Sequence, residues 1–269
     1  MSAAPSGHPG DHRLSSLLDD PSCSALLTDI DGTLAPIVER ADQASVPAGA
    51  RAALAALSER LALVGCISGR RALEARELVG LDQLAYAGNH GLELLLPGDA
   101  KPTTDPSVRG REGGALSFLE GLDRSLLQDA GLRIEDKGPI QALHWRGATD
   151  ERGAEARARE VAAVAGRTGL EPRWGRKVLE LRPLGGGDKG RAVATLLTTG
   201  IAVAAYAGDD RTDLDAFARL RELVSEGTLE RAICVGVASA EAPPELEDES
   251  DFTVDGPAGW VDLLDGLAG

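Results

Sequence analysis

The sequence predicts an α/β fold in which a doubly wound, mainly parallel sheet carries an inserted α+β cap domain. At both ends of the chain, short buried strands alternate with amphipathic helices, and this pattern is typical of a parallel sheet with right-handed crossovers. In the middle, the pattern changes to helices followed by pairs of strands with tight turns, which is typical of a small α+β unit. With 269 residues, the chain is long enough to bury a core in each part.

The first part of the core begins with the apolar run from Ala25 to Leu27, which suits a strand buried on both faces. Gly32 and Pro36 follow it and let the chain turn sharply. Pro47 suits the first position of a helix. The remaining elements are expected in the order strand, helix, strand, over residues 61–67, 72–79 and 84–87.

The middle of the chain predicts the cap. Gly, Lys, Pro, Thr and Asp between Gly98 and Asp105 have the composition of a linker, and Pro183 to Gly187 is expected to be the return linker. Between them we expect helices over 111–129 and 151–166, and strands over 132–136, 140–146, 171–174 and 177–181.

The doubly wound pattern then resumes. Asp188 is expected to cap a helix that runs to Leu197, and the later elements are a strand over 201–207, a helix over 212–224, a strand over 232–237 and a helix over 258–267. The acidic run over 241–251 predicts a solvated loop or frayed helix rather than a binding tail. We therefore divide the chain into a disordered tail, a core in two parts and a cap: residues 1–13, 14–104 with 184–269, and 105–183.

Composition and charge argue against several kinds of partner. The net charge of -15 would repel a nucleic acid backbone, and 3% aromatic residues offer no platform for stacking bases. No run approaches the ~18 apolar residues of a membrane span, and residues 1–13 lack the apolar core of an export signal. We expect a cytoplasmic monomer without nucleic acid or membrane partners. The three scattered cysteines, Cys23, Cys66 and Cys234, are expected to be buried thiols.

Reactive side chains follow the predicted strands where each one ends. Asp29 and Asp31 follow the first strand, Ser68 and Gly69 follow the second, and Asp209 follows a later one. Open α/β sheets bind ligands at the carboxyl edge of their strands. Carboxylates gathered at such an edge repel one another unless a cation neutralises them, and hard oxygen ligands favour Mg²⁺. Mg²⁺ in turn favours phosphate as a further ligand.

These residues suit phosphoryl transfer. Asp29 could attack phosphorus as a nucleophile, and Asp31 could protonate the leaving alcohol and then activate water. Lys189, at the start of a helix, would clamp the phosphate, and donors around Ser68 and Gly69 would bind it. Taken singly, the aspartates could form an Asx turn, Ser68 could be a helix cap and Lys189 a solvated lysine. Their shared placement at one edge favours the site.

The same motifs resemble the haloacid dehalogenase superfamily of phosphatases, and a longer set resembles trehalose-6-phosphate phosphatases. That set comprises Asp29-Ile-Asp31-Gly-Thr-Leu-x-Pro36-Ile37, Ser68-Gly-Arg70, Gly88-Asn-His90-Gly91, Glu135-Asp-Lys137-Gly, His144-x-Arg146, Gly175-Arg176-x-x-x-Glu180-x-Arg-Pro183, Asp188-Lys189-Gly190 and Gly208-Asp209-Asp210-x-Thr212-Asp213.

The resemblance implies Mg²⁺-dependent hydrolysis of trehalose 6-phosphate to trehalose and phosphate. It implies metal ligands at Asp29, at Asp31 through its backbone carbonyl, and at Asp209, with Asp213 behind them. It also implies substrate binding by a further set of residues: Arg70, Glu135, Lys137, Arg176 and Glu180.

Several alternatives stay open at this stage. Another sugar phosphate, such as a mannosyl- or glucosyl-3-phosphoglycerate, could be the substrate, or the chain could be a non-catalytic phosphate sensor. Lys177 stands beside Arg176, so either one could be the sugar ligand, and the charged cap residues could instead pair with one another. His90 and His144 could equally be structural, and we assign them no catalytic role.

Overall fold

The structure is a computed structural model that describes residues 11–38, 43–197, 200–240 and 242–269. It divides into two compact units. Unit 1 comprises the described residues up to Thr103 together with 187–269, and unit 2 comprises 104–186. Residues 1–10 of the predicted tail lie outside the described part, and the last three residues of that tail belong to helix α1, Asp11–Leu14.

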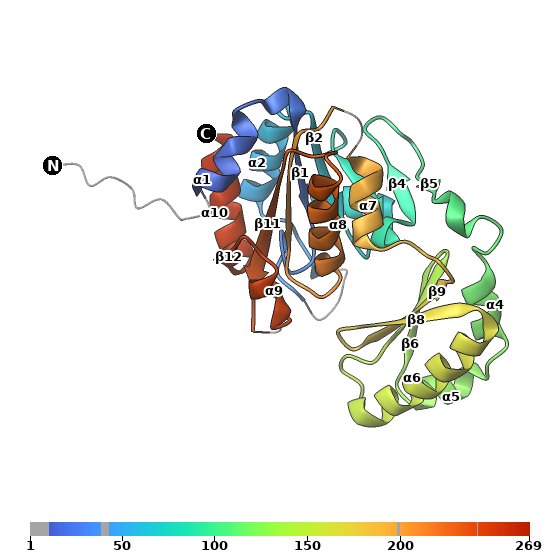
Figure 1. Ribbon diagram of the computed structural model, residues 1–269. Helices are drawn as coiled ribbons and strands as arrows, with labels where there is room; N and C mark the ends of the chain where they lie inside the picture. Colours follow the sequence, from blue (N-terminus) through green and yellow to red (C-terminus); the bar gives the residue numbers. More distant parts are fainter. Residues whose placement is uncertain (1–10, 39–42, 198–199, 241) are drawn as a thin grey trace. The chain divides into compact units, whose positions relative to one another are not determined.

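Unit 1 is organised around an eight-stranded sheet with the order β12-β11-β10-β1-β2-β3-β4-β5 (Figure 1). The neighbours from β12 to β3 pair in parallel, and β4 runs antiparallel to β3. This confirms the doubly wound, mainly parallel sheet. The strands are β1 Ser24–Thr28, β2 Leu63–Ile67, β3 Ala85–Gly88, β4 Glu93–Leu95, β5 Thr103–Thr104, β10 Val203–Gly208, β11 Arg231–Ala238 and β12 Phe252–Asp255.

Helices cover both faces of this sheet, so its central strands are apolar on both sides. Leu26 of β1 packs into the cluster formed with α1, α2, α3 and α10, and Leu27 packs into the cluster formed with α7, α8 and α9. Trp260, which is fully buried, donates its indole N–H to the Thr28 hydroxyl at 3.2 Å and so satisfies its polar atom. The helices are α2 Ala48–Ser58, α3 Ala72–Val79, α7 Lys189–Leu196, α8 Asp213–Ser225, α9 Glu245–Asp248 and α10 Gly256–Ala268.

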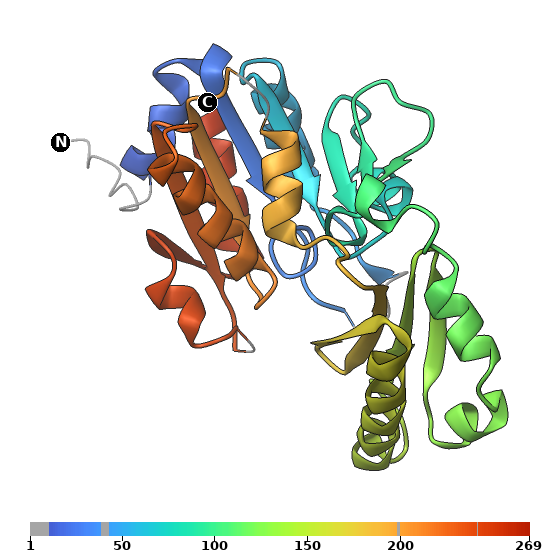
Figure 2. The same ribbon diagram turned by 45° about the vertical axis from the view of Figure 1, so that its right-hand side comes forward.

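Unit 2 contains a four-stranded antiparallel sheet with the order β6-β7-β9-β8. Figure 2 draws the strands and helices of this unit in green and yellow. Its strands are β6 Arg133–Lys137, β7 Ile140–His144, β8 Leu170–Gly175 and β9 Val178–Pro183. Helices α4 Gly114–Glu120 and α6 Glu151–Ala165 pack with α5 Arg124–Asp129 on one face of the sheet, around a core that includes Leu143, Leu179 and Leu181. The pattern of paired strands and helices is the predicted α+β unit.

The single helix predicted over 111–129 is wrong, because the structure contains α4 and α5 in its place. The carboxylate of Asp123 accepts a hydrogen bond from the Ser125 backbone N–H at 3.0 Å and caps a new helix. Gly121 precedes this cap, at the end of α4. Leucine periodicity continues across the break and therefore concealed it.

The described part of the acidic run, residues 242–251, is largely exposed apart from the buried Leu246, and its glutamates pair with arginines from other elements. Glu241 lies outside the described residues, and α9 occupies the middle of the run. Glu245 pairs with Arg211 at 3.2 Å, and Glu249 pairs with Arg221 at 2.5 Å. The run is thus partly helical and tied to its neighbours. Within the described part of the chain, no helix has the length and apolar character needed to cross a membrane.

Candidate active site

The predicted reactive residues of unit 1 meet because their strands are neighbours in the sheet. Asp209 follows β10, Asp29 follows β1 and Ser68 follows β2, and these three strands are adjacent and parallel. Their carboxyl ends therefore lie at one edge of the sheet, which is where such sheets bind ligands. All three side chains are buried, with Asp29 only 4% exposed.

The turn after β1 brings its residues against Asp209. The Ile30 carbonyl accepts hydrogen bonds from the backbone N–H groups of Leu34 and Ala35 at 2.9 and 2.8 Å. Gly32 has φ +96°, and a Cβ atom there would lie 2.2 Å from Asp209 Oδ2, so only glycine fits this close approach. Thr33 donates its hydroxyl to Asp209 Oδ1 at 3.1 Å. The turn thus fixes the orientation of the Asp209 carboxylate.

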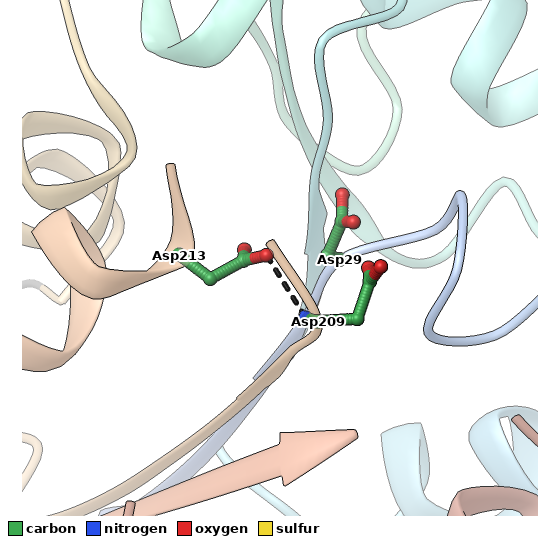
Figure 3. Close-up of side chains that lie close together, drawn as sticks. All are labelled: Asp29, Asp209 and Asp213. Carbon is green, nitrogen blue, oxygen red and sulfur yellow. Dashed lines mark hydrogen bonds between the residues drawn. The ribbon is translucent and has the colours of Figure 1, made fainter. Parts of the chain in front are cut away.

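Three buried carboxylates form a cluster at this edge, shown in Figure 3: Asp29, Asp209 and Asp213 each offer an oxygen, and these oxygens lie within 4.8 Å of one another. Asp213 Oδ2 accepts from the backbone N–H groups of Asp209 and Asp210 at 3.0 and 2.9 Å. Its Oδ1 accepts from Lys189 Nζ at 2.6 Å and from the Tyr206 hydroxyl at 2.5 Å. Because four donors already hold Asp213, its carboxylate braces the cluster.

Lys189 is the buried cation of the cluster, and only 2% of its surface is exposed. Its Nζ lies 3.0 Å from Asp29 Oδ1 as well as 2.6 Å from Asp213 Oδ1. Burial alone would lower the pKa of Lys189, but the charges of Asp213 and Asp29 raise it well above its ordinary value. Asp188 caps helix α7 through the Arg191 backbone N–H at 2.8 Å, so Lys189 occupies the first helical position.

The cluster carries more negative than positive charge, and it therefore fits a divalent cation. Burial raises the pKa of Asp29 well above its ordinary value; Lys189 opposes this shift, while Asp213 and Asp209 add to it. One ammonium cannot balance three buried carboxylates, and an unbalanced buried charge is costly. A divalent metal ion would remove the imbalance, and oxygen donors are the ligands that Mg²⁺ and Ca²⁺ prefer.

The Asp31 side chain lies outside this cluster and pairs with Arg70. Arg70 Nε donates to Asp31 Oδ2 at 2.7 Å, and Arg70 Nη2 donates to Asp31 Oδ1 at 2.6 Å. This two-point contact fixes both oxygens of the carboxylate. Arg70 was expected to bind substrate, which the structure does not test, and it also makes a direct contact with the predicted acid/base. Nothing in the sequence pattern pointed to that pair.

The loop after β2 also differs in detail from expectation. The Ser68 backbone N–H donates to the Ala87 carbonyl at 2.9 Å, so it serves the sheet, and the Ser68 hydroxyl is the group suited to phosphate. His90, which the sequence analysis left without a role, lies against this loop: a Cβ atom at Gly69 would be 2.8 Å from His90 Nε2. Asn89 and His90 have φ of 50° and 56°, a conformation that is uncommon outside glycine.

Unit 2 contains the predicted sugar-binding residues. Glu135 and Lys137 lie on β6 and Glu180 lies on β9. Pairing among these residues, which the sequence left open as an alternative, is present, because Lys137 Nζ donates to Glu180 Oε1 at 2.9 Å. His144, to which no catalytic role was assigned, contacts Glu135 Oε2 through Nε2 at 2.6 Å.

The structure also distinguishes Arg176 from Lys177. Arg176 lies in the turn between β8 and β9 and not on a strand. Lys177 Nζ lies 2.7 Å from Glu151 Oε2, at the start of α6. Because α6 packs on the apolar side of the sheet, Lys177 is directed to that side, and Arg176 is the better candidate for a ligand.

Comparison with known proteins agrees with this arrangement. The architecture matches that of a haloacid dehalogenase-like hydrolase from Bacteroides thetaiotaomicron, with a TM-score of 0.59, 13% identity and coverage of 90% of this chain and 98% of that one. The structure of the Candida albicans trehalose-6-phosphate phosphatase C-terminal domain is similar with a TM-score of 0.80, 21% identity and coverage of 96% and 97%. The fold is therefore that of the haloacid dehalogenase superfamily.

A family model for trehalose-phosphatases matches residues 27–250. The trehalose-phosphate phosphatase of Mycobacterium avium is 35% identical over 208 residues, which cover 73% of this chain and 51% of that protein. The chain belongs to the trehalose-phosphatase family. It spans about half the length of this curated relative.

Proposed function

We propose that the chain hydrolyses trehalose 6-phosphate to trehalose and phosphate, with Mg²⁺ as cofactor. The observation that supports this most strongly is the buried group of Asp29, Asp209, Asp213 and Lys189, whose carboxylate oxygens lie within 4.8 Å of one another. Membership of the trehalose-phosphatase family supports the choice of sugar phosphate. The alternatives, another sugar phosphate or a non-catalytic sensor, have no observation that favours them.

In this mechanism Asp29 attacks the phosphorus atom in line and forms an aspartyl-phosphate as the bond to the sugar oxygen breaks. Asp31 protonates the leaving oxygen and later takes a proton from the water that hydrolyses the intermediate. Lys189 and the Ser68 hydroxyl hold the phosphoryl oxygens, and Arg70 keeps the Asp31 carboxyl oriented. Asp29, Asp209 and the Asp31 backbone carbonyl would hold a metal ion that neutralises phosphoryl charge, with Asp213 bracing them.

We further propose that unit 2 is the cap that selects the sugar. Glu135, Lys137, Arg176 and Glu180 would bind its hydroxyl groups. A site built from such charged donors and acceptors discriminates strongly, because the wrong ligand would leave buried polar groups unpaired.

Phosphate release from a panel of substrates tests this function. The panel contains trehalose 6-phosphate, glucose 6-phosphate, glucosyl- and mannosyl-3-phosphoglycerate and p-nitrophenyl phosphate, each assayed with Mg²⁺ and with excess EDTA. We expect the highest kcat/KM for trehalose 6-phosphate and complete loss of activity in EDTA that added Mg²⁺ restores. Preference for another member would contradict the substrate, and inactivity on the whole panel would favour the sensor.

Arg70→Met is expected to reduce turnover mainly for substrates whose leaving group must be protonated. Arg70 holds both oxygens of Asp31 at 2.6 and 2.7 Å, so its loss should misplace the acid. We expect about a 100-fold lower kcat for trehalose 6-phosphate, in the range of one general acid. p-Nitrophenyl phosphate has a good leaving group and should lose less than about tenfold. Equal losses on both substrates would mean that Arg70 acts on the phosphate instead.

A further inference from the structure

One face of the unit 2 sheet is polar, and the register of the strands shows which residues lie on it. Glu135 pairs with Ala142, Ala142 pairs with Glu180, and Glu180 pairs with Arg173, so these four residues form one row across the sheet. Residues directly opposite one another on neighbouring strands point to the same face. The helices of unit 2 pack against the other face, around Leu143, Leu179 and Leu181. We call the face that carries Glu135 and Glu180 the polar face.

Arg182 lies on the polar face because it is two residues after Glu180 on the same strand. Its Nε donates to Glu180 Oε2 at 3.0 Å, and its Nη2 donates to the same oxygen at 2.5 Å. Lys137 Nζ donates to the other oxygen, Oε1, at 2.9 Å. The two oxygens of Glu180 are therefore each held by a different cation.

The three residues of this group are well buried, with 9%, 6% and 5% of Lys137, Glu180 and Arg182 exposed. Charge-assisted hydrogen bonds are strongest away from water, and together they fix the Glu180 side chain in one rotamer. Burial would lower the pKa of Lys137, but Glu180 and Glu135 raise it above its ordinary value, so the pair stays ionic. A carboxylate fixed in this way is preorganised to accept further hydrogen bonds from a ligand.

The charge balance of the polar face indicates the kind of group it would recognise. The carboxylates of Glu135 and Glu180 are matched by Lys137 and Arg182. On β8, the carboxylate of Glu171 is matched by Arg173. This balance suits neutral hydroxyl groups, and it contrasts with the excess charge beside Asp29, which suits a metal ion and a phosphoryl group.

We propose that Arg182 is a positioning residue, which holds the Glu180 carboxylate in place to accept hydrogen bonds from the hydroxyl groups of a sugar phosphate. This rests on the proposed function. Arg182 does not itself contact the sugar or the phosphate in this scheme, and its effect reaches the substrate through Glu180. Lys137 alone would leave Glu180 Oε2 without the two Arg182 hydrogen bonds that now fix it.

The test compares Arg182→Met with wild type on trehalose 6-phosphate and on p-nitrophenyl phosphate, which has no sugar. For trehalose 6-phosphate we expect kcat/KM to fall about 10- to 100-fold, the equivalent of one hydrogen bond to a charged group, mostly through KM. For p-nitrophenyl phosphate, kcat/KM should change less than about twofold because no hydroxyl is recognised. The matched control is Arg157→Met on helix α6, which packs on the opposite face of the sheet; it removes an arginine that pairs with Glu160 and should leave both substrates unchanged.

A double-mutant cycle shows whether Arg182 acts through Glu180. Arg182→Met should add little to Glu180→Gln if the two residues act as a unit, whereas independent roles would give additive losses and overturn the inference. Arg182→Lys keeps the positive charge but loses the planar guanidinium, so its kcat/KM for trehalose 6-phosphate should lie between those of wild type and Arg182→Met. This variant replaces Arg182→Met in the test if Arg182→Met does not fold. Equal losses on both substrates would also overturn the inference. If the wild-type protein showed no preference for trehalose 6-phosphate, the proposed function would be overturned instead.

Discussion

Asp29→Asn should reduce phosphate release from trehalose 6-phosphate by at least about 10⁴-fold, because the amide is not a competent nucleophile. The substitution preserves the shape of the side chain, which follows β1 and is buried beside Lys189 at 3.0 Å. It removes one negative charge from a cluster that has an excess of them, so the fold should be retained. Steady-state phosphate release and circular dichroism measure the two effects.

Asp19→Asn is the matched control for that change. Asp19 is exposed and precedes β1, outside the carboxylate cluster, so the same chemical substitution there should leave turnover unchanged. If Asp29→Asn kept more than a few per cent of wild-type turnover on repeated preparations, Asp29 could not be the nucleophile.

Lys189→Met should abolish turnover and also destabilise the fold. The ammonium contacts Asp29 and Asp213 at 3.0 and 2.6 Å, and the variant would leave both carboxylates buried without it. Removing one partner of a buried ion pair costs about 3–5 kcal/mol, so the free energy of unfolding measured in urea should fall by that amount. Mg²⁺ should recover part of the lost stability, because a ligand that binds only the folded state stabilises it.

The exposed Lys101 provides the comparison, since Lys101→Met loses the same charge at the surface and should change stability by less than about 0.5 kcal/mol. A Lys189→Met variant as stable as wild type would contradict the view that this lysine neutralises the cluster. If its turnover were also unchanged, the proposed phosphate clamp would be wrong.

Much of the site could be predicted from sequence because it depends on strand ends. Asp29, Ser68 and Asp209 each follow an apolar run, and the alternation of strands and helices already implied that these runs lie in parallel in one sheet. The topology then brings the three residues together without knowledge of any side-chain contact. The sequence predicted a turn at Gly32, but it did not predict the close approach of Gly32 to Asp209.

Side-chain partners could not be predicted, because they depend on rotamers and on contacts distant in sequence. Arg70 was expected only to bind substrate, and its contact with Asp31, 39 positions away, was not foreseen. Tyr206 falls in the strand predicted over 201–207, but the strand pattern did not indicate that its hydroxyl donates to Asp213. In unit 2, Glu180 and Arg182 share a face because they are two residues apart on β9, but the register of β6, β7 and β9 decides that Lys137 lies on that face beside them, and one sequence cannot fix that register.

The covalent intermediate is the central claim, and chemical trapping tests it most directly. Protein quenched during turnover of trehalose 6-phosphate with Mg²⁺ is treated with borohydride, which reduces an acyl phosphate to an alcohol, and peptides are read by tandem mass spectrometry. We expect homoserine at position 29 and at no other aspartate, and no homoserine when substrate is omitted. Homoserine at position 31 or 209 would contradict Asp29 as the nucleophile. So would unmodified Asp29 in protein that was quenched rapidly while it was turning over substrate.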